Sequence, residues 1–527
     1  MKKITELERW NKGLKGKEKI AFDALLDKEK RCSSSLNFGT AGVRGVMGLG
    51  SAHINEWTIT KIVVAFAQLL KVGERVLVSF DTRKNSKKYA KLVQKILLCK
   101  QIECISFKKA TPTSVLAFNV KKQGFDYGIM ITSSHNPKEY NGFKIIAKNG
   151  GQISDKFASQ IMKNAQKVNE FEEYYNIKNI KPKRNFAPKS YYKDFLDLCY
   201  SVSIVDEKPL INICYTPLNG TGLYLAKKIL KHNKYAFTVP PKHKKKDGEF
   251  KTCPYPNPEF NEAYVEAEKW SGENVDIIIA TDPDADRLGV KVRDKNNNFV
   301  LLSGNEVGLL LLKHKLDRRK EDSFVVSTVV SSPMVEKMCK KANVDLHLTL
   351  TGFKNITDKI ENTKGKVLLA FEESCGYIVH SYLRDKDGLS AMSLIAEIAN
   401  DYYRQNKTLL DALEELYAKY GYEISLNQSI EFKGEEGKLK IQQILEKLRS
   451  EKLPKTILGV TDYLDSEKTK LPKSNFLGYE LKNGRLFIRP SGTEPKLKLY
   501  VYGYGKTRQE AVTSAQAILV FAKELIK

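Results

Sequence analysis

The chain has 527 residues, of which 42% are hydrophobic and 28% charged, so it is long enough for about three or four globular domains. Its formal net charge of +26 suggests a nucleic-acid-binding role, but only 16 of the 88 basic residues are Arg, the usual residue for bidentate contacts to phosphate and bases. The Lys-rich pattern favours a solvated basic surface, and we expect no nucleic-acid partner. Such a surface would still attract a small anionic substrate.

The cysteines and the hydropathy pattern indicate a soluble cytoplasmic protein. The eight cysteines are scattered and form no CxxC pair, which is typical of reduced thiols in a cytoplasm. The first residues, MKKITELERW, lack the apolar segment of a signal peptide. No stretch approaches the roughly 18–20 apolar residues of a membrane-spanning helix. We therefore expect no membrane association, and the oligomeric state is left open.

The expected elements begin with two short amphipathic helices in the first ~35 residues, with Ile4, Leu7 and Trp10 on one face. Apolar runs of strand length then alternate with helical patterns, which indicates parallel, doubly wound sheets. The expected strands are 75–80, 127–132, 211–215, 275–280, 288–292, 324–330, 346–350 and 366–371. Helices are expected at 305–315, 333–341 and 389–404.

The C-terminal part has a different pattern, which indicates a small α+β domain. A helix is expected at 437–449, strands around Ile457, Tyr479 and Leu486, and a closing helix at 507–526. We therefore expect an N-terminal extension with a first α/β domain at 1–205, α/β domains at 206–302 and 303–420, and an α+β domain at 421–527. The polar clusters follow predicted buried strands, and ligands bind at that edge of an open α/β sheet.

The segment TDPDADR at 281–287 contains three carboxylates spaced two residues apart, Asp282, Asp284 and Asp286. A near-extended chain would direct all three to one side. Carboxylates this close raise one another's pKa unless a cation is present, and an all-oxygen group suits Mg²⁺. An ordinary acidic turn at Asp-Pro-Asp is the alternative.

The segment MITSSHNPKEYNGFK at 130–144 offers a nucleophile. Ser134 precedes His135, and Lys144 closes the segment. A serine hydroxyl needs a base, a metal or a cationic setting to carry a phosphoryl group. A plain Ser/Asn turn before a proline is the alternative.

Three further segments suit the binding of a phosphorylated sugar. In LAFEESCGY (369–377), Glu372 and Ser374 are suited to binding sugar hydroxyls, or Ser374 caps a helix. In FIRPSGTEPK (487–496), the candidate phosphate ligands are Arg489, Ser491, Gly492 and Thr493, and a simple hairpin turn is the alternative. In NFGTAGVRG (37–45), Arg44 is expected in a glycine-bracketed loop.

Together these groups are the components of a phosphoryl-transfer enzyme that acts on a polyol. The chain contains neither a P-loop GxxxxGK[ST] motif nor a kinase glycine-rich motif, so the sequence indicates no nucleotide donor. The phosphoryl group would then be carried on the enzyme itself.

The motifs TSSHNP, DPDADR, EESCG and RPSGTEPK, in this order, resemble those of the α-D-phosphohexomutase family of phosphoglucomutases and phosphomannomutases. The resemblance covers the chain from about Asn37 to Lys527. It implies three similar doubly wound α/β domains and a smaller C-terminal α+β domain around a central cleft. It also implies an isomerase that needs one Mg²⁺ per chain and a sugar 1,6-bisphosphate as primer.

The same resemblance assigns a role to each candidate residue. Ser134 is implied to be the phosphoserine, whose phosphate binds Mg²⁺ together with Asp282, Asp284 and Asp286. Arg44, His135 and Lys144 match positions that support proton and phosphoryl transfer. The implied substrate-binding residues are Arg287, Glu372, Ser374, Arg489, Ser491, Gly492 and Thr493. Phospho-Ser134 would donate to a sugar monophosphate, and the bound bisphosphate would turn over and return its other phosphate.

Several further sequence features bear on the choice of sugar. GTAG at 39–42, Phe371 before the two glutamates, and TGFK at 351–354 resemble the branch with phosphopentomutase-like and longer bacterial phosphoglucomutase enzymes. Asn219 and Asn355 stand where family members often carry His and Trp. We expect a mutase for glucose or mannose 1-phosphate and the 6-phosphate. A phosphopentomutase, a hexose 1,6-bisphosphate synthase and a non-catalytic scaffold are the alternatives.

Overall fold

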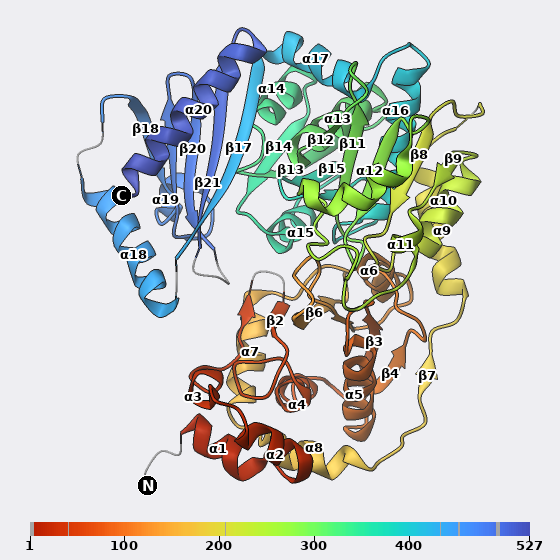
Figure 1. Cartoon of the computed structure of the whole chain (residues 1–527), viewed down its shortest axis with the longest axis vertical. Helices are drawn as coiled ribbons and strands as arrows, with labels where there is room; N and C mark the ends of the chain where they lie inside the picture. Colours follow the sequence, from red (N-terminus) through yellow and green to blue (C-terminus); the bar gives the residue numbers. More distant parts are fainter. Residues whose placement is uncertain (1–4, 40–41, 206, 433, 452–453, 492–495) are drawn as a thin grey trace. The chain divides into compact units, whose positions relative to one another are not determined.

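The computed structural model describes residues 5–39, 42–205, 207–432, 434–451, 454–491 and 496–527 (Figure 1). The chain forms two compact units. The first comprises Met1–Val307 and Ser374–Gln405, and the second comprises Gly308–Glu373 and Asn406–Lys527.

Three short helices open the chain, α1 (Glu6–Gly13), α2 (Gly16–Asp23) and α3 (Lys28–Arg31). A capping box between Thr5 and Glu8 starts α1 and satisfies two of its free N–H groups. Trp10 is fully buried, with its ring centroid 5.2 Å from that of Phe171 and 6.0 Å from that of Trp57. Burial of Trp10 is therefore as expected, whereas the segment forms three short helices instead of the expected two, and Ile4 lies outside the described residues.

The first sheet has seven strands in the order β1-β2-β6-β5-β3-β4-β7. Strands β3, β4, β5 and β7 are parallel, whereas β6 is antiparallel to β5 and β2 to β6. The strands are β1 (Phe38–Gly39), β2 (Gly42–Val46), β3 (Arg75–Phe80), β4 (Glu103–Ser106), β5 (Tyr127–Ile131), β6 (Tyr140–Ala147) and β7 (Asn185–Phe186). The apolar runs of β3 and β5 are buried, as expected for inner parallel strands.

The helices of this part connect and cover its strands, and α4 packs on α5, α7 and α8. They are α4 (Glu56–Ala67), α5 (Ser86–Cys99), α6 (Thr113–Lys122), α7 (Asp155–Ala165), α8 (Glu170–Lys178) and α9 (Ser190–Val202). Aliphatic side chains from α4, α5 and strands β3 and β5 form one continuous core.

The second sheet has the order β12-β11-β10-β8-β9, and it also belongs to the first unit. Strands β8 to β10 are parallel, and β11 turns back antiparallel to β10. The strands are β8 (Asn212–Thr216), β9 (Ala236–Thr238), β10 (Ile277–Thr281), β11 (Leu288–Arg293) and β12 (Phe299–Leu302). The helices are α10 (Leu223–His232), α11 (Pro241–Lys244), η1 (Asn261–Tyr264) and α12 (Val265–Ser271). The short strand β16 (Gly376–Ile378) and helix α16 (Gly388–Tyr403) complete the unit.

The second unit holds a parallel group of strands and an antiparallel sheet. Strands β14 (Asp345–Thr349), β13 (Ser323–Thr328) and β15 (Lys366–Glu372) are parallel neighbours. Their helices are α13 (Gly304–Asp317), α14 (Met334–Lys341), α15 (Phe353–Glu361) and α17 (Leu409–Tyr420).

The antiparallel sheet has five strands in the order β17-β21-β20-β19-β18. These are β17 (Tyr422–Glu431), β18 (Ile457–Asp462), β19 (Leu477–Leu481), β20 (Gly484–Pro490) and β21 (Lys496–Gly505). Helices α18 (Gly434–Ser450), α19 (Ser466–Thr469) and α20 (Arg508–Leu525) accompany it.

The expected α/β class and the α+β character of the C-terminal part are confirmed, although the first two sheets are mixed rather than purely parallel. One expectation was wrong. Arg44 lies inside strand β2 and not in a loop, because the glycines allow β2 to pair closely with β6. Within the described residues, no helix has the length and apolar character needed to cross a membrane.

Candidate active site

Asp282, Asp284 and Asp286 form a fully buried cluster directly after strand β10. One carboxylate oxygen from each lies within 4.8 Å of the others. The chain turns tightly here rather than continuing extended, because the N–H groups of Asp286 and Arg287 donate to Asp282 Oδ1 at 3.1 and 3.0 Å. The expected convergence is confirmed, but a turn produces it and not strand alternation.

The turn depends on close backbone packing. A Cβ on Gly220 would lie 2.5 Å from Pro283 Cα, and Thr221 donates its N–H to Pro283 O at 2.9 Å. Ala285 adopts a positive φ of 56°, a conformation that L residues rarely take. Backbone packing and hydrogen bonds therefore define the shape of this loop.

Lys144 binds one side of the cluster. Its Nζ donates to Asp284 Oδ2 at 2.7 Å and to Asp286 Oδ2 at 2.6 Å, and the lysine side chain is only 2% exposed. The other oxygens, Asp284 Oδ1 and Asp286 Oδ1, are buried without a hydrogen-bond partner among the described residues. Two unsatisfied carboxylate oxygens beside a third carboxylate suit a hard divalent cation such as Mg²⁺.

The cluster shifts the pKa values of its members in opposite directions. Burial raises the pKa of Asp282 well above its usual range, and Asp284 and Asp286 add to the effect. Burial alone would raise the pKa of Asp284, but Lys144 outweighs it and the pKa falls below its usual range. For Lys144, burial is outweighed by the two carboxylates, so its pKa rises and it stays charged. A bound cation would stabilise the charged forms of these buried carboxylates.

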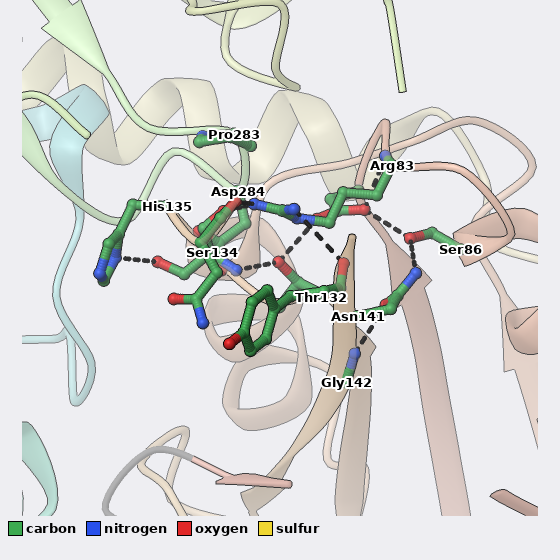
Figure 2. Close-up of polar contacts among 12 residues, drawn as sticks. Arg83, Ser86, Thr132, Ser134, His135, Asn141, Gly142, Pro283 and Asp284 are labelled. Carbon is green, nitrogen blue, oxygen red and sulfur yellow. Dashed lines mark hydrogen bonds and ion pairs between the residues drawn. The ribbon is translucent and has the colours of Figure 1, made fainter. Parts of the chain in front are cut away.

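Ser134 lies beside this cluster, on the turn that follows strand β5 (Figure 2). Its hydroxyl donates to Asp282 Oδ2 at 2.7 Å, and its Oγ is 3.3 Å from His135 Nδ1. The serine is 1% exposed and has a positive φ of 52°. The fold therefore brings the candidate nucleophile and the candidate metal ligands into direct contact from segments 148 residues apart.

His135 is neutral in this setting. Burial lowers the pKa of its imidazole well below the usual range, and the nearby cations Arg287 and Arg44 lower it further. A neutral imidazole has one ring nitrogen that accepts and one that donates, so it is suited to moving a proton.

Arg44 and Lys144 are placed by the antiparallel pairing of β2 and β6, in which Arg44 lies opposite Gly142. A Cβ on Gly142 would lie 2.1 Å from Val43 O, so only glycine allows this pairing distance. Burial lowers the pKa of the Arg44 guanidinium, and Asp284 and Asp286 oppose that shift. Arg44 is thus close enough to the acidic cluster to interact with it electrostatically.

Arg287 closes the metal loop, as expected. Its guanidinium forms an ion pair with Glu259, a residue that the motif analysis missed. Arg287 also forms a β-bridge with Gly376, and Leu288 donates its N–H to Cys375 O at 3.0 Å. The segment after Ser374 is therefore joined to the metal loop within the first unit.

In the second unit, Glu372 ends strand β15. Burial raises the pKa of its neighbour Glu373 to about 7, and the charge of Glu372 contributes. No helix follows directly, since a turn leads from Glu372 into β16, so the alternative reading of Ser374 as a helix cap was wrong.

Arg489 lies near the end of β20, opposite Lys498 of β21, and Ser491 donates its N–H to Lys496 O at 2.7 Å. Strands β20 and β21 therefore pair antiparallel on either side of this segment. Gly492 and Thr493 lie outside the described residues.

Besides Glu259, Thr113 and Arg83 also contact the site and belong to none of the motifs. Thr113 donates its hydroxyl to Asp284 Oδ2 at 2.7 Å. Arg83 contacts the Ser134 turn, and its partner Asp81 follows strand β3. The signal for Asp81 and Arg83 was present, because FDTR at 80–83 is also a polar cluster after a buried strand.

A buried serine that contacts one of three clustered carboxylates, with a lysine, two arginines and a neutral histidine nearby, is an arrangement suited to phosphoryl transfer. Comparison with known proteins identifies the particular kind. Four domain families described as phosphoglucomutase/phosphomannomutase domains I, II, III and C-terminal match residues 35–172, 189–295, 303–420 and 407–517. The chain therefore belongs to the phosphoglucomutase/phosphomannomutase family.

Individual relatives agree with this assignment. A phosphoglucomutase from Staphylococcus saprophyticus is 34% identical over 88% of this chain and 90% of its own length. The solved structure of a putative phosphomannomutase from Thermus thermophilus has a TM-score of 0.72 at 20% identity, with 92% of this chain and 99% of that chain covered. An Aspergillus fumigatus N-acetylphosphoglucosamine mutase in complex with GlcNAc-6P and magnesium has a TM-score of 0.52 at 15% identity, with coverage of 98% and 100%.

The chain is thus a phosphotransferring hexose phosphate mutase, an isomerase, and neither the pentose nor the synthase alternative is favoured. The matched ranges show where the chain is similar to the family, and they do not mark the limits of folded units. The expected domain limits therefore stay a prediction.

Proposed function

We propose that this enzyme interconverts glucose or mannose 1-phosphate and the corresponding 6-phosphate, with phospho-Ser134 as the phosphoryl carrier. The observation that supports this most strongly is the contact of 2.7 Å between Ser134 Oγ and Asp282 Oδ2, beside two buried carboxylate oxygens that lack partners among the described residues. A phosphoryl group on Ser134 would stand at this acidic cluster and would share its cation.

Asp282, Asp284 and Asp286 would hold the cation, and the A. fumigatus mutase structure contains magnesium. Bound there, Mg²⁺ would neutralise charge on the phosphoryl oxygens. Lys144 has a separate role, since it fixes the Oδ2 atoms of Asp284 and Asp286 and leaves their Oδ1 atoms available.

In the first half-reaction, the bond between phosphorus and Ser134 Oγ breaks as a bond forms to the free hydroxyl of the sugar phosphate. That hydroxyl loses a proton, and Ser134 Oγ gains one. His135 is suited to this transfer because it is neutral and its Nδ1 lies 3.3 Å from Ser134 Oγ. In the second half-reaction, Ser134 takes the other phosphoryl group of the bound 1,6-bisphosphate, and the proton returns to the sugar oxygen.

The remaining assignments follow from the resemblance. Glu372 and Ser374 are proposed to bind sugar hydroxyls, and Arg287 the phosphate. Arg489, Ser491, Gly492 and Thr493 are proposed as a second phosphate-binding group. A small phosphosugar is the only partner that we propose, and the cytoplasmic location stays a prediction.

Two departures from the family pattern have local structural roles. Asn219 donates to the carbonyl oxygens of Lys242 and Lys245 at 3.1 and 2.9 Å. Asn355 donates to Thr351 O at 2.9 Å. Both side chains therefore hold neighbouring backbone, and neither contact favours a pentose over a hexose.

The test is a turnover assay with Mg²⁺ and a trace of glucose 1,6-bisphosphate. Glucose, mannose, ribose and deoxyribose 1-phosphates are compared by kcat/KM for the wild type, Ser134→Ala and Ser133→Ala. Ser133 is a matched control, because it is equally buried and its hydroxyl has no partner among the described residues. We expect turnover with a hexose phosphate that only Ser134→Ala abolishes. A higher kcat/KM for a pentose phosphate, or an active Ser134→Ala, would contradict the proposal.

A further inference from the structure

Arg83 lies directly behind the candidate phosphoserine and belongs to none of the motifs described above. It follows strand β3, and its side chain is fully buried. Its Nε lies 3.2 Å from Asp81 Oδ2, and its guanidinium stacks over the ring of Phe250 at 4.8 Å from the centroid. A buried arginine is costly to desolvate, so its contacts need to compensate for this cost.

The hydrogen bonds of its two terminal nitrogens are all with the backbone of a single loop. The two terminal nitrogens of Arg83 donate to four carbonyl oxygens between residues 134 and 140. One nitrogen reaches Ser134 O and Asn136 O, and the other reaches Pro137 O at 2.8 Å and Tyr140 O at 3.4 Å. The planar, five-donor guanidinium is suited to this task, whereas an ammonium group is not.

Asp81, the ion-pair partner of Arg83, fixes the N–H of Ser134 through Thr132. Asp81 Oδ2 accepts a hydrogen bond from Thr132 Oγ1 at 2.8 Å, and Thr132 Oγ1 accepts one from the N–H of Ser134 at 2.8 Å. Asp81 Oδ1 is itself fixed by Ser86 Oγ at 2.6 Å. Both backbone polar groups of Ser134, its N–H and its C=O, are thus bound by the Asp81–Arg83 pair, directly or through Thr132.

This matters because Ser134 has a φ of 52°, in the left-handed region that disfavours residues other than glycine. Such a conformation persists only where surrounding contacts enforce it. It is also the conformation in which the Ser134 hydroxyl points to Asp282 at 2.7 Å. Without the contacts from Arg83 and from Asp81 through Thr132, the loop would relax to an ordinary backbone conformation. The Ser134 hydroxyl would then turn away from the acidic cluster.

We propose that Arg83 is a positioning residue for phosphoryl transfer, which holds the Ser134 backbone so that its oxygen stays at the metal-binding carboxylates. The proposal rests on the proposed role of Ser134 as the phosphoryl carrier. Arg83 acts through Ser134 and not on the substrate, because its terminal nitrogens are occupied by loop carbonyls.

The test is Arg83→Lys, which keeps the positive charge but removes the planar guanidinium whose two terminal nitrogens donate to the loop carbonyls. Arg293→Lys is the matched control. Arg293 is in the same unit and likewise donates to three loop carbonyls, those of Val275, Asn297 and Gly272, and it lies over Phe299 at 4.2 Å. These carbonyls lie before β10 and in the β11–β12 turn, outside the segments 130–144 and 281–287.

We expect kcat of Arg83→Lys to fall by about 100-fold, the order of loss that a misplacement of about 1 Å causes, with KM changed less than about threefold. Arg293→Lys should lose stability without a comparable fall in kcat. Thr132→Val, which removes the link to the Ser134 N–H without removing a buried charge, should lower kcat in the same way by about tenfold. If Arg83→Lys does not fold, Thr132→Val carries the test alone.

The fraction of each variant that can be phosphorylated at Ser134, measured by mass spectrometry, separates misplacement from simple unfolding. A wild-type kcat for Arg83→Lys or Thr132→Val, or a loss fully explained by a smaller folded fraction, would overturn the inference. A wild type that never carries phosphate on Ser134 would overturn the proposed function first, and this inference with it.

Discussion

At the scale of single residues, the site combines buried charges, each of which would destabilise the folded protein without its partner. Lys144 carries its positive charge in a buried position because Asp284 and Asp286 flank it at 2.7 and 2.6 Å. The two aspartates in turn need the positive charge of the lysine, since their Oδ1 atoms have no hydrogen-bond partner among the described residues. Removal of one partner from a buried ion pair leaves an uncompensated charge.

We predict that Lys144→Met destabilises the protein by about 3–5 kcal/mol, the usual cost of removing one partner from a buried pair. The measurement is urea unfolding in the absence of divalent ions. Lys148→Met is the control, because Lys148 is 73% exposed and pairs with Asp126 at the surface. It should change stability by less than about 1 kcal/mol. Equal losses in the two variants would show that burial of Lys144 is not what makes it important.

The residue types of the site could be predicted from the sequence because their spacing carries the chemistry. Asp282, Asp284 and Asp286 could be read from one heptapeptide, and Ser134 from its neighbour His135. The contacts of Arg83 with the Ser134 loop could not be predicted from the sequence, because they join a side chain to backbone about fifty residues away. In the sequence, an arginine that makes such contacts looks the same as an arginine at the surface.

At the scale of elements, the pairing of β2 with β6 places both Arg44 and Lys144, and glycines set its spacing. The glycines around Arg44 in the sequence predicted a loop. The structure uses the same glycines for a tight strand pair, since a Cβ at Gly42 would lie 2.3 Å from Phe143 O. Pairing partners of this kind are non-local, so a local glycine pattern does not distinguish a loop from a close pair of strands.

Gly142→Ala should therefore destabilise the protein by about 1–3 kcal/mol and lower kcat, because the new Cβ would meet Val43 O at 2.1 Å and displace the strand of Arg44. The matched control is Gly459→Ala in strand β18, where the nearest atom to the new Cβ is Glu480 Cβ at 3.8 Å. That variant should be neutral or slightly stabilising. Thermal unfolding and the mutase assay measure both effects. A stable, fully active Gly142→Ala would contradict the role assigned to this pair.

A second prediction concerns strand β17, where Glu423 is buried and accepts a hydrogen bond from Ser332 Oγ at 2.5 Å. Burial raises the pKa of Glu423 from 4.5 to about 7. In the unfolded chain the carboxyl ionises near its ordinary pKa, so its contribution to stability is complete below pH ~4.5 and is lost as the pH rises to ~7. Glu423→Gln removes this dependence.

The free-energy difference between Glu423→Gln and the wild type should therefore shift in favour of the variant by up to about 3 kcal/mol between pH 4.5 and pH 8. Urea unfolding at both pH values measures the difference. Glu446→Gln, at an exposed position of helix α18, should follow the wild type at both pH values. A difference between Glu423→Gln and the wild type that does not change with pH would show that Glu423 titrates normally.

At the scale of the whole molecule, the alternation of apolar strands and helices predicted the α/β class. The five helices for which limits were expected, α13, α14, α16, α18 and α20, begin and end within three residues of those limits. The strand order and the antiparallel members could not be predicted, because they depend on long-range pairing. Family similarity covers the chain from residue 35 to residue 517 in four segments.

Because cation binding selects the folded state, Mg²⁺ should raise the thermal midpoint of the wild type. At a concentration about 100 times its Kd, the expected stabilisation is about 2.7 kcal/mol. Thermal unfolding with EDTA and with excess Mg²⁺ measures this shift. Asp286→Asn should lose most of it, whereas Asp126→Asn, at an aspartate paired with surface Lys148, should keep it. A shift of equal size in Asp286→Asn would place the cation elsewhere.

The most direct test of phosphoryl carriage by Ser134 is a pulse and chase with glucose 1,6-bisphosphate that carries labelled phosphorus. After the pulse, peptide mapping should find the label on Ser134 in the wild type and in Ser133→Ala, and no label in Ser134→Ala. A chase with unlabelled glucose 6-phosphate should move the label from the protein into sugar bisphosphate within one turnover. Label on another residue, or label on Ser134 that stays during the chase while turnover continues, would contradict the account.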